Sequence, residues 1–353
     1  MDYSAVVDVH QKPQNHEVQI FESREGARIA QLPLNAFPDF WVYAYLVLVD
    51  DICVLIDTGS GFHENNQHLE EGFRDAGDLL GEPIEFSDLT HVLITHGHID
   101  HYGGLPFVRQ KSKALIGVHE LDQHNLTHTE ERLAITATRL ERYLAEAGLG
   151  TETSQELVQI YKMTKLNYQP QKVDFTYEAV DMQLGPLTML HVPGHCAGQV
   201  VIRLHDVLFS GDHVLSKISP HQAPERLSLF TGLNHYLQSL EATQSWSEGI
   251  QLSLGGHNPP VTDLKQRIRE IQDIHKERLA EFLEILKEPH TIAEISKTYF
   301  GETHGYNIIL ALEEAGAHIE YLYERGQLEI ANLDEVESGG GLAPICYKAL
   351  SPA

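Results

Sequence analysis

The sequence has few cysteines and no long hydrophobic run. Its three cysteines, Cys53, Cys196 and Cys346, are odd in number and far apart, whereas a disulfide framework uses an even, clustered set. The most apolar stretch, residues 41–49, ends at two aspartates and is much shorter than the roughly 18 residues that a membrane span needs. The first residues have neither the basic start nor the apolar core of a secretory signal. We therefore expect a cytoplasmic protein with reduced thiols and no membrane segment.

Positive charge is also scarce. The 353 residues include 25 Lys plus Arg against 51 Asp plus Glu, which gives a formal net charge of −26. A chain of this charge repels polyanions, so we expect neither nucleic acid nor a membrane surface as a partner. The composition, with 42% hydrophobic and 22% charged residues, is typical of a globular protein, and the length allows a large core and a second, smaller unit.

Strand-like runs alternate with helical stretches over the first 260 residues, which predicts a layered α/β domain. The expected strands are residues 40–61 (a hairpin around two aspartates), 90–96, 114–120, 180–195, 199–212 and 250–257, and the expected helices are residues 64–80 and 234–246. Residues 121–172 read instead as a helical insertion. We therefore assign residues 1–262 to a catalytic domain with this insertion, and residues 263–353 to a separate C-terminal domain.

The C-terminal domain reads as a winged-helix-like unit. An apolar stripe over residues 268–286 predicts one helix, and residues 291–299 and 305–323 predict two more, with Thr291 as the cap of the second. Two strand-like runs, residues 327–333 and 344–350, flank an acidic, glycine-rich loop. Residues 264–331 carry 8 basic and 13 acidic side chains, so we expect this unit to pack on the catalytic domain and not to bind nucleic acid.

Histidine, by contrast, is abundant, with 22 in the chain. Residues 96–101, with the sequence HGHIDH, place three imidazoles and a carboxylate at the end of an apolar run. These four residues are His96, His98, Asp100 and His101. Their nitrogen and oxygen donors suit zinc or iron, and a tight turn lets them point in different directions. One ion could not easily use all four.

Three further residues stand in a similar setting. His195, Asp212 and His257 each follow a strand-like run and lie beside a glycine, which lets the backbone turn sharply and brings their side chains toward a common centre. In so histidine-rich a chain, a single histidine is more often an ordinary structural residue. We interpret the histidines outside these motifs in that way, with His119 and His213 the closest cases because both lie near strand ends.

With these motifs, the sequence resembles the metallo-β-lactamase superfamily, and in particular its glyoxalase II-like and winged-helix-bearing hydrolases, over about residues 30–260. The resemblance implies an αββα sandwich. It also implies a ligand set, in which His96, His98 and His195 bind one divalent ion, Asp100, His101 and His257 bind a second, and Asp212 bridges both. Asp57 would orient these ligands from behind. Zinc is the expected metal, with iron and manganese as alternatives.

The resemblance further implies hydrolysis of an ester, thioester or lactone carbonyl by a hydroxide that bridges the two ions. Asp100 or Asp212 would pass the proton to the leaving group. The expected partner is a small-molecule acyl substrate, and a homodimer is left open. Two alternatives also stay open. One is a metal-dependent phosphodiesterase or ribonuclease, which would work against the acidic charge, and the other is an iron-dependent sulfur dioxygenase.

Three differences from other branches of the superfamily narrow the choice of branch. Asp212 stands where one class of true β-lactamases has cysteine, and His98 stands where diiron flavoproteins have glutamate. Only 45 residues separate Asp212 from His257, which leaves no room for the large insertion of RNA-processing relatives. The insertion at 121–172 could cover the substrate, although we expect Tyr143, Tyr161 and Tyr168 to pack as core. Cys196, next to His195, is expected to pack as well.

Overall fold

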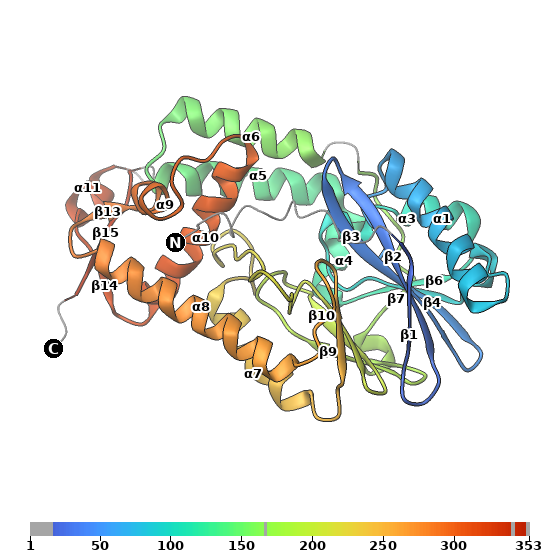
Figure 1. Cartoon of the computed structure of the whole chain (residues 1–353). Coiled ribbons are helices and arrows are strands. Elements are labelled where there is room, and N and C mark those ends of the chain that lie inside the picture. The colour runs from blue at the N-terminus through green and yellow to red at the C-terminus, as the bar shows by residue number, and fades with distance from the viewer. Residues whose placement is uncertain (1–16, 166–167, 340–342, 351–353) are drawn as a thin grey trace.

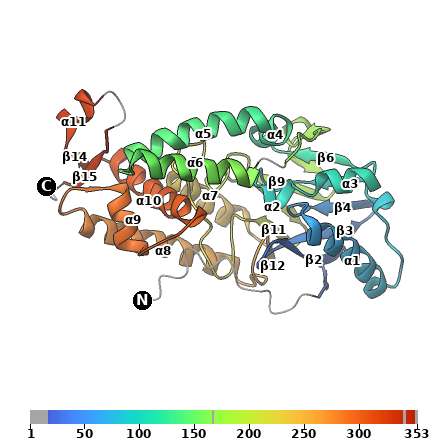
Figure 2. The same cartoon turned by 90° about the horizontal axis from the view of Figure 1, so that it is seen from above.

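The computed structural model describes residues 17–165, 168–339 and 343–350 (Figure 1). Two sheets pack face to face with helices on their outer faces, and a mainly helical lobe lies at one end of the molecule (Figures 1 and 2). The first 16 residues of the predicted catalytic domain, and Gly340 and Gly341 of the predicted acidic loop, lie outside the described residues.

The first sheet has seven strands in sequence order. They are β1 (Gln19–Glu22), β2 (Arg28–Phe37), β3 (Phe40–Val49), β4 (Ile52–Ile56), β5 (His91–Leu93), β6 (Leu115–Val118) and β7 (Phe175–Thr176). Pairing is antiparallel from β1 to β4 and parallel from β4 to β7. The predicted hairpin is confirmed as β3 and β4, but β1 and β2 were not expected.

The second sheet has the order β12-β11-β10-β9-β8. Its strands are β8 (Gln183–Leu184), β9 (Leu187–His191), β10 (Val200–Leu204), β11 (Val207–Gly211) and β12 (Leu252–Gly255). Only β11 and β12 pair in parallel. Both strands therefore end at the same edge of the sheet, where they can present side chains to one site.

Alternation along β3 explains why the sheets form layers. Leu46 faces one core, together with Phe73 of α1 (His63–Leu80), whereas Tyr45 and Val47 face a second core that includes Phe209 of the other sheet. Successive strand side chains point to opposite faces, so an entirely apolar strand must be covered on both sides. Helices α1 and α3 (Leu105–Lys111) cover the first sheet, and α7 (Leu233–Trp246) and α8 (Leu264–Ile285) cover the second.

The C-terminal residues form three helices, one short helix and a small sheet. These are α8, α9 (Ile292–Phe300), α10 (Tyr306–Glu324), α11 (Leu333–Ser338), β13 (His290–Thr291), β14 (Leu328–Ile330) and β15 (Cys346–Ala349). The predicted cap is confirmed, because the Thr291 hydroxyl accepts from the Glu294 N–H in a capping box. Helix α11 occupies part of the predicted loop.

The insertion is helical, as predicted, with α4 (Glu120–Thr127), α5 (Thr129–Glu146) and α6 (Thr151–Lys165). Helices α5 and α6 lie side by side and extend toward the C-terminal helices (Figure 2). Their apolar faces share one core with α8, α9 and α10, in which Tyr143 and Tyr161 are buried. The Tyr143 hydroxyl also donates to the Leu312 carbonyl of α10. Most of the length of α5 and α6 therefore packs on the C-terminal helices.

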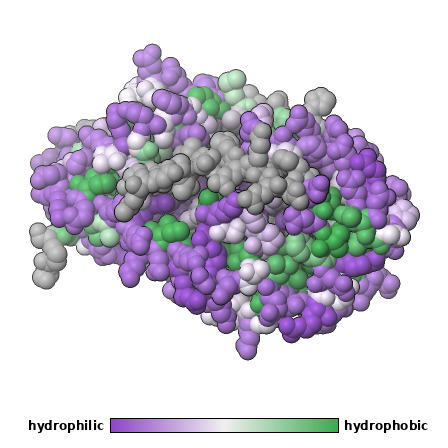
Figure 3. Space-filling model, in the orientation of Figure 1, coloured by the Kyte–Doolittle hydropathy of each residue, from purple (hydrophilic) through white to green (hydrophobic). Residues whose placement is uncertain are grey.

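Among the described residues, no helix is long and apolar enough to cross a membrane. The face in Figure 3 is mostly hydrophilic, and apolar residues gather mainly over the two-sheet part of the molecule. This distribution agrees with the large excess of acidic residues in the sequence.

Candidate metal centre

The residues of the predicted metal site lie where strands of both sheets end. His96 and His98 follow β5, and Asp100 and His101 lie in the single-turn helix α2 (Ile99–Tyr102) that comes next. In the second sheet, His195 follows β9, Asp212 follows β11 and His257 follows β12. The two packed sheets thus bring together residues that are far apart in the sequence.

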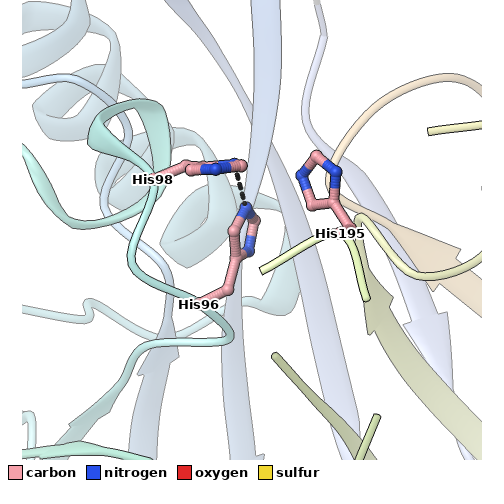
Figure 4. Close-up of side chains that lie close together, drawn as sticks. All are labelled: His96, His98 and His195. Atoms are coloured by element: carbon pink, nitrogen blue, oxygen red, sulfur yellow. Dashed lines mark hydrogen bonds between the residues drawn. The ribbon is translucent and has the colours of Figure 1, made fainter. Parts of the chain in front are cut away.

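His96, His98 and His195 form one group, and their candidate ligand atoms all lie within 4.8 Å of one another. Figure 4 shows His96 and His98 on one loop and His195 across from them, with the three rings grouped around a common space. His96 Nε2 lies 3.1 Å from His98 Nδ1, and the ring centroids of His98 and His195 are 4.5 Å apart. The structure therefore assembles the three histidines expected at the first ion.

Asp100, His101 and His257 form a second group of the same size. His257 Nε2 lies 3.5 Å from Asp100 Oδ2. Asp212 lies between the groups. Its Oδ2 is 3.2 Å from His257 Nε2 and 3.7 Å from His195 Nε2, and its Oδ1 is 3.5 Å from His101 Nε2. This is the position expected of a residue that contacts both ions.

Three of the donor atoms that face inward have no hydrogen bond to a described residue. His101 Nε2, His195 Nε2 and Asp212 Oδ1 are buried and lack a hydrogen bond to any residue that the structure describes. The outward nitrogens are held instead, because His195 Nδ1 lies 2.7 Å from the His221 carbonyl and His257 Nδ1 lies 2.8 Å from the Trp41 carbonyl. Buried polar atoms without partners are rare, and ligating histidines are anchored through their second nitrogen. The donor set therefore fits metal ions.

The charges at the centre are also those of a metal site. Burial lowers the pKa of His96, His98 and His195, which keeps their imidazoles neutral with a free lone pair. Burial raises the pKa of Asp212, but His257 and His101 lower it well below its usual range. Burial lowers the pKa of His257, and Asp212 and Asp100 raise it to about 10. Two carboxylates thus already attract positive charge to this point, as cation binding requires.

Asp57 lies behind the ligands, as the resemblance implied. One oxygen accepts from the Thr95 N–H at 2.8 Å, and the other lies 2.7 Å from the Thr95 hydroxyl and 2.8 Å from His101 Nδ1. Its backbone is left-handed, with φ of 59°, a conformation that costs free energy in residues other than glycine and is often retained at functional sites. Asp57 therefore fixes the ring of His101 and the start of the ligand loop.

Asp122 of α4 is a buried residue near the site that the sequence analysis missed. Its carboxylate accepts from the Gly97 N–H at 2.7 Å and from the Cys196 thiol at 3.3 Å, and the Gly198 N–H also donates to it. It therefore joins the loop of His96 and His98 to the loop of His195. A Cβ at Gly97 or Gly198 would collide with this carboxylate. An acidic residue in a helical stretch gave no local signal of this role.

Helix α10 of the C-terminal lobe holds the segment behind His195. His221, whose carbonyl lies near His195 Nδ1, has its own Nε2 3.0 Å from Glu313 Oε2. The neighbouring Glu314 accepts from the Gln222 N–H at 2.7 Å and pairs with Arg278 of α8. The C-terminal lobe is thus connected to the metal centre through two hydrogen bonds.

Several other described histidines are held by contacts within the protein. His213 is buried with Nε2 2.9 Å from the Thr243 hydroxyl, and His119 lies 2.8 Å from Glu178 and stacks on His191. His275, Glu314 and His318 form another compact group. In that group His275 and His318 hydrogen-bond to each other at 3.0 Å and Glu314 pairs with Arg278, so its donors are already used within the protein.

The sequence matches the family model of the metallo-beta-lactamase superfamily over residues 39–277. The chain belongs to this superfamily. The match contains all seven predicted metal ligands and Asp57, and it extends beyond the predicted boundary at residue 262 into α8. The family and the mixed α/β fold expected from the sequence are therefore confirmed.

Individual members of the superfamily can be aligned with most of the chain. A probable metallo-hydrolase of Bacillus subtilis, YqjP, is 23% identical over 80% of this chain and 87% of its own length. A metallo-beta-lactamase family protein from Thermus thermophilus is 25% identical, with a TM-score of 0.69 over 91% of this chain and 98% of its own. A beta-lactamase domain protein from Burkholderia ambifaria is 22% identical, with a TM-score of 0.69 over 98% and 96%. These findings support the prediction that the protein is a metal-dependent hydrolase.

Proposed function

We propose that this member of the superfamily is a dinuclear metal-dependent hydrolase that attacks an ester, thioester or lactone carbonyl of a small-molecule substrate. The observation that carries the proposal is the pair of ligand groups, each spanning at most 4.8 Å between donor atoms, with Asp212 between them. Six ligands and a shared carboxylate exceed what one tetrahedral ion takes. Imidazole and carboxylate donors suit zinc, with iron and manganese as alternatives.

Each residue has a part in the proposed reaction. His96, His98 and His195 would hold one ion, Asp100, His101 and His257 the other, and Asp212 both. When bound, two divalent ions lower the pKa of water toward neutrality and polarise a carbonyl oxygen. The side chain of Asp100 is 16% exposed, against 9% for Asp212. Asp100 is therefore better placed to take the proton of the attacking water and to deliver it to the leaving group.

We also infer a supporting role for the C-terminal lobe. A winged-helix-like unit over residues 263–353 is supported by α8, α9 and α10, which precede the antiparallel pair β14–β15. Its recognition-type helix, α10, is buried against α6, α7 and α8, and its Glu313 and Glu314 contact His221 and Gln222, which lie behind His195. A helix used in this way is not free to enter a nucleic-acid groove, and its acidic residues would oppose it.

The proposal places the protein in the glyoxalase II-like branch and in the cytoplasm. The branch is supported by Asp212 at the bridging position and His98 in the first ligand group. The cytoplasm is supported by Cys53, Cys196 and Cys346, all of which are free thiols. A homodimer stays a proposal that gel filtration with light scattering would test.

Metal analysis and a substrate panel test the function. We expect close to two ions per chain in protein purified without chelator, and hydrolysis of at least one thioester, ester or lactone. His98→Ala should abolish this activity, whereas His124→Ala, which removes an exposed histidine of α4, should keep it. Less than one ion per chain, or full activity in His98→Ala, would refute the proposal.

The same panel separates the alternatives. Cleavage of bis-p-nitrophenyl phosphate without thioester hydrolysis would indicate a phosphodiesterase. Bound iron with oxygen uptake in the presence of a persulfide would indicate a sulfur dioxygenase.

A further inference from the structure

Phe62 is an unusual residue for its place in the chain. It is the N-cap of α1, and its side chain makes no capping hydrogen bond. Ser, Thr, Asp and Asn are strongly preferred at this position, because their side-chain oxygen accepts from an N–H of the first turn. The phenyl ring is also 39% exposed, although it is large and apolar. The sequence thus forgoes a helix cap and leaves an apolar ring in water, which indicates that the ring serves function and not stability.

The loop that carries Phe62 packs on the helix that carries two of the metal ligands. The Thr58 N–H donates to the carbonyl of ligand His101 at 2.7 Å. Gly61 lies so close to the end of α2 that a Cβ there would collide with the Gly103 carbonyl. Phe62 is the next residue along the chain. Its backbone therefore lies directly beside the ligand helix.

A row of aromatic rings connects Phe62 with a metal ligand. The ring centroid of Phe62 lies 5.5 Å from that of Phe37, which lies 5.9 Å from that of Phe40. Phe40 in turn meets the ring of ligand His257 edge-on at 5.0 Å. Phe37 and Phe40 are both partly exposed. The row thus begins at the second ligand group and leads out to an exposed ring.

Two hydrogen bonds hold the row in place. His257 Nδ1 lies 2.8 Å from the Trp41 carbonyl, which ties the β2–β3 hairpin to the metal ligand. The Ser60 hydroxyl donates to the Ala36 carbonyl, which ties the loop between β4 and α1 to the same hairpin. These two segments supply the three phenylalanines. The rings are therefore positioned before a substrate arrives, and a positioned surface costs less free energy to bind.

The chemistry of the row indicates what it binds. The side chains of Phe40, Phe37 and Phe62 carry neither a charge nor a hydrogen-bonding group. The ring of Tyr168, which is half-buried, continues the row with an edge-on contact to Phe62 at 5.8 Å. Sites lined by aromatic side chains bind the apolar parts of ligands. Because four rings follow one another, the row suits an extended hydrocarbon chain better than a single planar group.

We propose that this row binds the acyl chain of the substrate, so that the enzyme prefers unbranched medium-chain acyl thioesters or esters to acetyl compounds. The acyl chain is bonded directly to the carbonyl carbon that is attacked at the metal ligands, and the row likewise begins at a ligand. This assignment rests on the proposed hydrolase function, and it specifies the class of substrate.

Two series of thioesters test the assignment through turnover. The first is S-acetyl-, S-butanoyl-, S-hexanoyl- and S-octanoyl-N-acetylcysteamine, which differ only in the length of the acyl chain. For the metal-loaded full-length protein we expect kcat/KM to rise about two- to fourfold for each added methylene, as removal of a methylene from water implies. The second series, the acetyl thioesters of ethanethiol, butanethiol, hexanethiol and octanethiol, lengthens the thiol side and should show little rise.

Phe62→Ser separates function from stability. Serine removes the ring but supplies a helix cap, so the midpoint of thermal unfolding should stay unchanged or rise. The octanoyl-to-acetyl ratio of kcat/KM should nevertheless fall about tenfold. Phe62→Leu, which keeps an apolar side chain, should retain most of the ratio. Leu79→Ser removes a 59% exposed side chain near the other end of α1; it is the matched control and should keep the wild-type ratio.

A binding measurement makes the outcome independent of catalysis. The ketone analogues of the acetyl and octanoyl thioesters, in which a methylene replaces the sulfur, cannot be hydrolysed. They are titrated by calorimetry into the wild type, Phe62→Ser and Leu79→Ser. The octanoyl analogue should bind more tightly than the acetyl analogue to the wild type and to Leu79→Ser, and Phe62→Ser should lose most of this difference.

The results separate the two proposals. Equal kcat/KM for acetyl and octanoyl thioesters, a rise only in the thiol series, or an unchanged ratio in Phe62→Ser would overturn the acyl-chain site even if thioesters are hydrolysed. Binding of the octanoyl ketone that depends on Phe62, without hydrolysis of any thioester or ester, would support the site and refute the hydrolase function.

Discussion

Substitution of Asp122 by alanine should loosen two ligand loops at once. The carboxylate lies on α4, outside both loops, yet it accepts hydrogen bonds from Gly97 and Gly198 and from the Cys196 thiol. Alanine would leave the N–H groups of Gly97 and Gly198 without this acceptor. Because His96 and His98 flank Gly97 and His195 lies three residues before Gly198, both halves of the first ligand group would lose their anchor.

The magnitude follows from these contacts. A hydrogen bond to a charged acceptor contributes about 1.5–3 kcal/mol, so the two backbone bonds contribute about 3–6 kcal/mol. Burial of the carboxylate opposes this gain, as the raised pKa of Asp122 shows, with burial as its main cause. We therefore expect Asp122→Ala to lower the free energy of unfolding by about 2–5 kcal/mol. Loss of a partner that orients ligands should also weaken zinc binding roughly 10- to 100-fold.

Urea denaturation of the metal-free protein and competition of zinc with a chromophoric chelator measure the two effects separately. Asp122→Asn, which keeps one acceptor oxygen, should fall between wild type and Asp122→Ala. Glu120→Ala removes an exposed acidic residue from the same helix and should change stability by less than about 1 kcal/mol. Unchanged urea midpoint and zinc affinity in Asp122→Ala would show that the carboxylate does not hold the loops.

Three further predictions concern the second ligand group, the metal and pH. Asp57→Ala should lower zinc affinity roughly 10- to 100-fold, because His101 loses its anchor. Competition of zinc with a chelator measures this affinity in Asp57→Ala and Asp57→Asn, and wild-type affinity in both variants would contradict the prediction. Removal of metal with a chelator should lower the midpoint of thermal unfolding, and added zinc should restore it, since ligands that bind only the folded state stabilise it. An unchanged midpoint in calorimetry would show that the metal does not stabilise the fold. Burial lowers the pKa of His318 to about 4, so between about pH 6.5 and 4 the unfolded chain binds a proton that the folded chain does not. The free energy of unfolding should therefore decrease as the pH is lowered, and His318 should account for a loss of about 2 kcal/mol at pH 5. The urea midpoint of His318→Asn should depend less on pH in that range than the midpoint of the wild type.

Local patterns were sufficient to predict the layered fold and to single out the candidate metal-binding residues. Predicted helix 64–80 is α1 at residues 63–80, and the strands before His195, Asp212 and His257 all exist. These elements have strong periodicity, and the ligands stand at their ends, where glycines mark sharp turns. The structure brings the seven residues into compact groups of the kind that the resemblance implied, whereas their spacing in the sequence did not indicate which of them would lie together.

Non-local contacts explain what the sequence did not reveal. Strand β2 contains Gln31, Pro33 and Asn35 at alternate positions, a pattern that argues against a central strand. The structure accommodates Gln31 by burial against the Tyr45 hydroxyl, at 3.0 Å. Asp122 and Glu314 are acidic residues on helices, and only folding shows that backbone N–H groups from distant loops donate to them. Such partners cannot be read from a helix by itself.

The shared core of α5 and α6 with α8–α10 has a consequence for how the chain folds during synthesis. Tyr306, the start of α10, lies 160 positions after Glu146, the end of α5. At about 5–20 residues per second, the ribosome needs roughly ten to thirty seconds to make them. Until α8, α9 and α10 have been made in turn, the apolar faces that α5 and α6 present to them stay uncovered, although the two sheets can already form. The nascent protein should therefore depend on chaperones most while the insertion waits for the last helices to emerge.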